Sequence, residues 1–80
     1  MHVSRFDLNL FVVFDAIYTE GSLTRAAKVL NLTQPAVSHA LGRLRDRLGD
    51  PLFVRQGSRM VPTARARAMV SPVRHALGGF

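Results

Sequence analysis

The sequence predicts a small, mainly α-helical domain, and three observations support this prediction. Apolar residues recur at helical spacing along most of the chain. Residue types that commonly begin or end helices stand at the edges of these segments. One short stretch, residues 52–61, instead has the composition of two β-strands joined by a turn. With 80 residues, 48% of them hydrophobic, the chain is near the lower size limit for a domain with its own core.

The most informative stretch of the sequence is residues 33–48, where a helix is expected. Thr33 is an N-cap residue type, Pro35 fits a first turn, and Gly49 can end a helix in the left-handed conformation. One face carries an apolar stripe formed by Val37, Leu41, Leu44 and Leu48. The other face carries Gln34, Ser38, His39, Arg43 and Arg47. Such a face is suited to a DNA major groove, although an ordinary solvated helix would show the same pattern.

A first helix is expected at residues 8–18. Its apolar side chains form two neighbouring stripes, one of Leu10, Phe14 and Ile17 and one of Phe11 and Tyr18. A buried strand over residues 10–14 is the competing interpretation, but the helical spacing continues beyond it. We expect this helix to end near Glu20 and Gly21, and residues 1–7 to be extended or frayed.

A second, shorter helix is expected after Ser22, which is another N-cap residue type. Its apolar stripe consists of Leu23, Ala26, Ala27 and Leu30. Asn31 and Leu32 would form a tight turn before Thr33, with the Leu32 side chain in the core. Two short helices joined by such a turn, the second bearing a basic face, form the helix-turn-helix pattern, and an ordinary helical hairpin is the alternative.

Residues 52–61 are expected to form a β-hairpin. Residues 52–54 and 60–61 are short β-type runs, and residues 56–58 between them are turn-forming. Arg55 and Arg59 flank the tip. A hairpin beside a helix-turn-helix is a wing, and its arginines could reach phosphates or a narrow minor groove.

A last helix is expected after Thr63, its N-cap. Its apolar stripe consists of Ala66, Met69 or Val70, Val73 and Leu77. Pro72 lies inside this stripe, where it removes a backbone hydrogen bond, so we expect a kink or a break there. A domain this small cannot cover the whole stripe, so we expect a second copy of the chain to pair with it. The expected organisation is a DNA-binding domain at residues 1–62 and the start of a dimerising linker helix at residues 63–80.

The charge is uneven along the chain. Residues 1–32 carry equal numbers of basic and acidic side chains, so the net charge of +6 lies entirely in residues 33–80. All basic side chains except Lys28 are arginines, the residue type best matched to phosphate and to guanine edges. This distribution predicts a surface that binds a polyanion.

Several classes of function are not expected. The chain has no cysteine, and its three histidines lack the spacing of metal ligands, so we expect neither a disulfide nor a metal site. Ser38 and His39 point in different directions on a helix and have no acid to orient the imidazole, so we expect no catalytic residue, no enzyme activity and no cofactor. No apolar run is long enough to span a membrane, and we expect a cytoplasmic protein.

The segment GSLTRAAKVLNLTQPAVSHALGRLRDRLGDPLFVR, followed by a Gly turn and VPT, closely resembles the N-terminal DNA-binding domain of LysR-type transcriptional regulators. The resemblance extends over residues 6–77 and includes the spacing of Ala26-Ala27, residues 34–38, Leu44 and residues 49–55. It implies a winged helix-turn-helix, a linker helix that forms a homodimer, and a C-terminal inducer-binding domain that this sequence lacks. It also implies a bacterial, nucleoid-associated regulator whose partner is double-stranded DNA.

Three positions depart from the common pattern of this family. His39 stands where many members have Arg or Gln, Arg45 stands where Glu is common, and residues 63–66 read Thr-Ala-Arg-Ala instead of Thr-Glu-Ala-Gly. These variants resemble the branch that includes the nodulation regulators. They leave the expected fold unchanged but affect which bases are preferred.

The resemblance assigns roles by position. It implies base contacts in the major groove for Gln34, Pro35, Ala36, Ser38 and His39. Gln34 could pair with adenine, Pro35 and Ala36 could touch a thymine methyl group, and His39 could donate to guanine N7. Phosphate or sugar contacts are expected for Thr24, Arg25, Thr33, Arg43, Arg55 and Arg59. The dimer contact is expected at Ala66, Met69, Val70, Val73 and Leu77. A helical protein-interaction module without DNA affinity is the alternative function.

Overall fold

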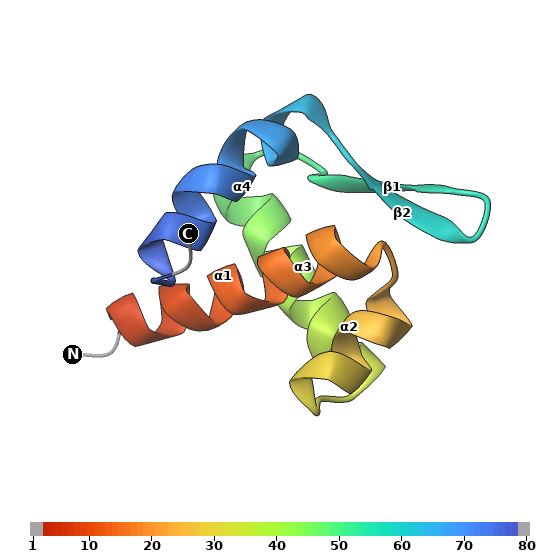
Figure 1. Cartoon of the computed structure of the whole chain (residues 1–80), viewed down its shortest axis with the longest axis horizontal. Coiled ribbons are helices and arrows are strands. Elements are labelled where there is room, and N and C mark those ends of the chain that lie inside the picture. The colour runs from red at the N-terminus through yellow and green to blue at the C-terminus, as the bar shows by residue number, and fades with distance from the viewer. Residues whose placement is uncertain (1–2, 79–80) are drawn as a thin grey trace.

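The computed structural model describes residues 3–78, with side chains from Leu10 onward. Its elements are α1 (Val3–Glu20), α2 (Leu23–Leu30), α3 (Gln34–Leu48), β1 (Phe53–Gln56), β2 (Arg59–Pro62) and α4 (Ala64–Ala76). Figure 1 shows the helices gathered on one side and the hairpin projecting away from them. The mainly helical fold with a hairpin wing is therefore confirmed.

Helix α1 is the central element in space, because it contacts α2, α3, α4 and β2 (Figure 1). Its buried residues are Leu10, Val13, Phe14, Ala16 and Ile17, so both expected apolar stripes are covered at least in part. The prediction that residues 1–7 precede the helix is wrong for residues 3–7, since α1 begins at Val3. Met1 and His2 lie outside the described residues.

An aromatic cluster joins α1 to the base of the hairpin. The ring of Phe14 lies 5.4 Å from that of Phe53 and 6.0 Å from that of Tyr18. Tyr18 meets Phe53 nearly edge to face, at 6.3 Å. Phe14 and Phe53 are fully buried, so the first residue of β1 belongs to the same core as α1.

Helices α2 and α3 begin and end as their sequences predict. Ser22 Oγ accepts a hydrogen bond from the Arg25 N–H at 3.1 Å, and Gly49 ends α3 with a φ of +61°. Asn31 adopts the left-handed conformation after α2, and the Leu32 N–H then bonds back to Ala27 O. This turn keeps Leu32 at the outer end of α2. The prediction that Leu32 enters the core is therefore wrong, because its side chain is 46% exposed.

The predicted hairpin is present, but its turn consists of Gly57 and Ser58 alone, because Gln56 belongs to β1. Its strands pair antiparallel from Phe53 opposite Pro62 to Gln56 opposite Arg59. The Met60 N–H donates to Gly21 O at 2.9 Å, which fastens β2 to the end of α1.

Helix α4 packs back onto α1. Ala66 and Val73 are buried, and Arg74 donates to Asp15 Oδ1 at 2.7 Å and to Thr19 Oγ1 at 3.0 Å. We expected a kink or a break at Pro72, and a break is wrong, since α4 continues through this residue. These contacts on both sides of Pro72 hold the helix on α1 despite the lost backbone hydrogen bond.

Candidate nucleic-acid interface

The N-terminal end of α3 projects from the domain. Residues 31–36, which form the turn before α3 and its first residues, are all exposed. Farther along the helix, Val37, Leu41 and Leu44 are buried in the core. Helix α3 is thus held from Val37 onward and presents its first residues outward, as a helix that enters a DNA groove must.

The residues predicted to contact bases lie on this projecting end. Gln34, Pro35, Ala36 and His39 are exposed, and Ser38 is half-buried. Gln34 Nε2 donates to Ser38 Oγ at 3.1 Å, so the two polar side chains are joined within one helical turn. The arrangement offers amide, hydroxyl and imidazole groups, all of which can read base edges.

The first turn of α2 lies on one flank of this end. Thr24 and Arg25 are exposed there. Arg25 Nε lies 3.8 Å from Glu20 Oε1, but the Arg25 side chain is 73% exposed, so this ion pair contributes little and does not prevent a contact with phosphate. Thr33 is exposed as well, and its hydroxyl accepts a hydrogen bond from the Ala36 N–H.

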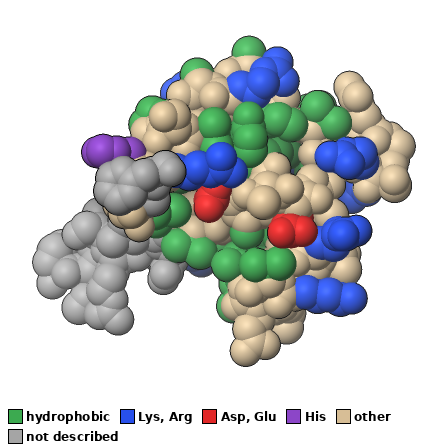
Figure 2. Space-filling model, in the orientation of Figure 1, with side chains coloured by type: hydrophobic (Ala, Val, Ile, Leu, Met, Phe, Trp, Pro, Cys, Tyr) green, Lys and Arg blue, Asp and Glu red, His purple; other side chains and the backbone are tan. Residues whose placement is uncertain are grey.

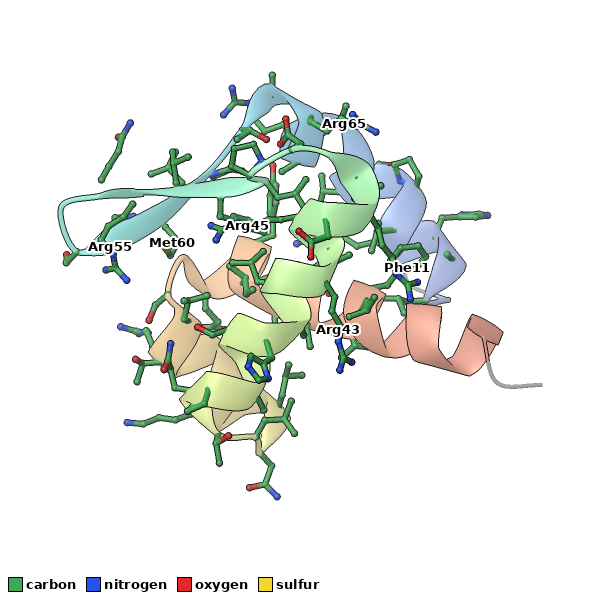
Figure 3. The ribbon with its side chains drawn as sticks, turned by 180° about the vertical axis from the view of Figure 1, so that it is seen from behind. Phe11, Arg43, Arg45, Arg55, Met60 and Arg65 are labelled. Carbon is green, nitrogen blue, oxygen red and sulfur yellow. The ribbon has the colours of Figure 1, made fainter. Side chains whose placement is uncertain are left out.

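Arg43 lies on the face of α3 that also carries Ala36, since both residues line one hollow next to α1. It is exposed, but its side chain borders a hollow that Leu10, Val13 and Ala40 also line. Figure 3 shows it beside α1. The structure therefore places Arg43 on a different side of α3 from the wing.

The two predicted wing arginines occupy different positions. Strand alternation places Arg55 on the hairpin face of Phe53 and Met60, as Figure 3 shows for Arg55 and Met60, and Arg59 on the opposite face. The Arg59 guanidinium curls onto Gly21, where an added Cβ would lie 3.0 Å from it. Arg59 thus lies at the C-terminal end of α1, which favours a cation. Both arginines are exposed.

A hollow of about 370 Å³ separates the wing from α3. Ser38, Arg45, Phe53 and Arg55 all line it. It brings a predicted base contact, Ser38, near a predicted backbone contact, Arg55. Figure 2 shows Lys and Arg side chains along the edge that the hairpin and α2 form, so the surface around this region is basic.

Two residues with structural roles were missed in the sequence. Arg45 donates to Pro51 O at 2.7 Å and to Phe53 O at 2.8 Å, and Asp50 accepts from the Leu52 N–H and the Thr63 hydroxyl, each at 2.8 Å. An Asp two residues before an amide that it caps is a recognised turn signal, so Asp50 could have been found. Arg45 gives no such signal, because its acceptors are backbone carbonyls.

The predicted dimer contact stays a prediction, and its five residues differ in how much surface they keep. Ala66 and Val73 are buried within this domain, so neither offers its side chain to a second copy. Met69, Val70 and Leu77 are half-buried and keep some surface. Part of the apolar stripe of α4 is thus covered by α1 instead of by a partner.

Two other features, a membrane-spanning helix and a metal site, are absent from the described residues. No helix in this part of the chain has the length and hydropathy needed to cross a membrane. Residues 3–78 bring together no group of three His, Cys, Asp or Glu side chains that could hold a metal ion.

The chain was compared with known proteins. Residues 8–67 match the family described as bacterial regulatory helix-turn-helix proteins, lysR family. Nodulation protein D 2 of Bradyrhizobium elkanii is 51% identical over 77 residues, which are 96% of this chain and 23% of that protein. The chain therefore spans about a quarter of the length of such relatives.

Solved structures show the same fold. A probable transcriptional regulator from Pseudomonas aeruginosa superposes with a TM-score of 0.86 at 51% identity, over 94% of this chain and 25% of that one. The DNA-binding domain of CbnR, solved in complex with DNA, superposes with a TM-score of 0.84 at 27% identity, over 89% of this chain and 82% of that one. The winged helix-turn-helix is therefore confirmed, and the chain belongs to the LysR family of bacterial regulatory helix-turn-helix proteins.

Proposed function

We propose that the chain binds double-stranded DNA sequence-specifically, as the DNA-binding part of a bacterial transcriptional regulator. The observation that carries this proposal is the exposed N-terminal end of α3 beside a basic wing. The similarity to the CbnR domain, which was solved with DNA, supports it. In this proposal α3 enters the major groove, and the hairpin lies on the backbone or the minor groove.

The contacts divide into two kinds. Base contacts are assigned to Gln34, Pro35, Ala36, Ser38 and His39, which share the projecting end of α3. Backbone contacts are assigned to Thr24, Arg25, Thr33, Arg55 and Arg59, all of which are exposed. Arg43 remains in this second group only if the DNA also reaches the side of α3 next to α1.

The proposed assembly is a homodimer through α4. Met69, Val70 and Leu77 supply the apolar surface that α1 leaves partly uncovered. A two-fold dimer relates two copies of α3, so the DNA site would be an interrupted inverted repeat with half-sites whole helical turns apart. A small-molecule inducer would act through a C-terminal domain of the longer protein, which we place in the cytoplasm on the nucleoid.

A binding titration across a salt series tests this proposal. The probes are the duplex that the chain selects from a random pool and a scrambled duplex of equal length. We expect tighter binding to the selected duplex, with log affinity falling linearly as log salt rises. An affinity that is absent, or that does not depend on salt, would instead favour a protein-interaction module.

A further inference from the structure

The junction between α3 and β1 holds a leucine in an unusual backbone conformation. Leu52 has a φ of +64°, and Pro51 O accepts a hydrogen bond from the Phe53 N–H across it at 2.7 Å. A bulky residue rarely adopts this conformation, which persists only where its surroundings fix it. Three contacts fix Leu52. Its N–H donates to the Asp50 carboxylate, its carbonyl accepts a hydrogen bond from the Thr63 N–H at 2.8 Å, and its side chain is fully buried.

Arg45 attaches α3 to both sides of this turn. Its Nε donates to Pro51 O at 2.7 Å, and its second guanidinium nitrogen donates to Phe53 O at 2.8 Å. Figure 3 shows Arg45 in the space between α3 and the hairpin. Both bonds are charge-assisted, and the planar guanidinium fixes their directions in a way that a lysine ammonium cannot.

The position of Phe53 determines where the wing stands. Phe53 is the first residue of β1, and Arg55 lies two residues later on the same face. Arg45, Ser38 and Arg55 line one hollow between α3 and the hairpin. A change in the Arg45 contacts would therefore move Arg55 relative to the projecting end of α3.

We infer that Arg45 is a positioning residue for DNA binding, which holds the wing so that α3 and Arg55 contact one duplex together. This inference rests on the proposed function. A wing without this attachment would lose more conformational freedom on binding, and its contact with DNA would stabilise the complex less. The inference does not require Arg45 to touch DNA, since its bonds to Pro51 and Phe53 form within the chain itself.

A double-mutant cycle between Arg45→Lys and Arg55→Ala tests the inference, with the selected and scrambled duplexes as probes. Arg45→Lys keeps the charge but replaces the planar guanidinium with an ammonium whose donors are not fixed in direction. We expect it to weaken binding to the selected duplex about tenfold in the native background and less than about twofold when Arg55 is already Ala. Arg67→Lys is the matched control, because Arg67 also donates a hydrogen bond to a backbone carbonyl, that of Pro62, which lies opposite Phe53 on the second strand. It should change binding less than about twofold.

Hydrogen exchange of the chain without DNA gives a second readout. We expect faster exchange of the paired hairpin amides in Arg45→Lys and unchanged exchange in α3. If Arg45→Lys fails to fold, Arg45→Gln, which can still donate to one carbonyl, takes its place in both measurements.

The outcomes separate this inference from the proposed function. An equal loss of affinity in both backgrounds would mean that Arg45 contacts DNA itself, and unchanged hairpin exchange would mean that it does not hold the wing. Either result overturns the inference while the DNA-binding proposal stands. A native chain without salt-dependent affinity for either duplex overturns the proposed function and this inference with it.

Discussion

Helices α3 and α4 begin in the same way and are used differently. Each follows a threonine whose hydroxyl accepts a hydrogen bond at 3.2 Å, from the Ala36 N–H at Thr33 and from the Ala66 N–H at Thr63. Thr33 is exposed, whereas Thr63 is half-buried and its hydroxyl also donates to Asp50. The same capping chemistry therefore leaves one helix end open to a ligand and fastens the other to the core.

This difference shows what a capping motif does and does not predict. Thr33 and Thr63 mark where a helix begins, because both satisfy an amide that the helix leaves unpaired. What the helix end faces depends on its neighbours. Asp50 closes one end, and nothing in the described chain covers residues 31–36 at the other. Substitutions at equivalent places on α3 and α4 should therefore have different consequences.

The largest effect should come from the buried side of α4. Val73→Glu places a carboxylate in the core without a partner, and we expect the free energy of unfolding to fall by about 4 kcal/mol or more. Urea denaturation followed by circular dichroism measures this loss. Val70 is half-buried, so Val70→Glu should cost about 1 kcal/mol or less and leave the chain folded.

Of these two variants, Val70→Glu tests the proposed dimer, because Val73→Glu disrupts the core. Sedimentation should show that Val70→Glu shifts the chain toward monomer, with affinity for a full site approaching that for a half-site. A dimer that survives Val70→Glu would place the interface elsewhere, with α1 as the next candidate.

The two caps should differ in their contribution to stability. Thr63→Ala removes a cap and the hydrogen bond to Asp50, and we expect a loss of about 2–3 kcal/mol. Thr33→Ala removes a cap alone and should cost about 1 kcal/mol. Urea titrations of the two variants under the same conditions compare them. Equal losses would contradict the structural difference between the two helix ends.

The exposed N-terminal end of α3 should determine which DNA sequences the chain prefers, and His39 tests this. His39→Ala removes an exposed imidazole without disturbing the core, so the variant should fold normally. We expect binding to the selected duplex to weaken by about 1–3 kcal/mol and binding to a scrambled duplex to change little. Equal weakening on both duplexes in a competition titration would make His39 a phosphate contact.

Much of the fold could be predicted because its signals are local. Ser22, Thr33 and Gly49 mark helix ends through hydrogen bonds or backbone angles within a few residues, and Gly57 marks the hairpin turn in the same way. The apolar stripe of α3 was confirmed at Val37 and at the two leucines that follow it. Local chemistry suffices for these features.

The errors concern which neighbour covers a residue. Periodicity showed that Ala66 and Val73 are on an apolar face, but not that α1 covers them within one chain. Leu32 is apolar and still exposed. Asn31 before it adopts the left-handed conformation, which ends α2 and turns the chain so that Leu32 lies outside the core. Arg45 binds backbone carbonyls, which every residue has, so no pattern in the sequence could single out its partners.

The smallest effects are expected for the two wing arginines, Arg55 and Arg59, whose contacts with DNA remain a prediction. Arg55→Ala and Arg59→Ala should each reduce the slope of log affinity against log salt by about 0.9, the value for one phosphate contact. Arg59→Ala should also lower stability slightly, because the Arg59 guanidinium lies against Gly21 at the end of α1. Arg67→Gln removes a charge from the start of α4 and serves as the control with an unchanged slope. If Arg55→Ala leaves the slope as steep as in the native chain, Arg55 does not contact the DNA backbone, and the backbone contacts that remain are those of Arg59, Thr33 and the first turn of α2.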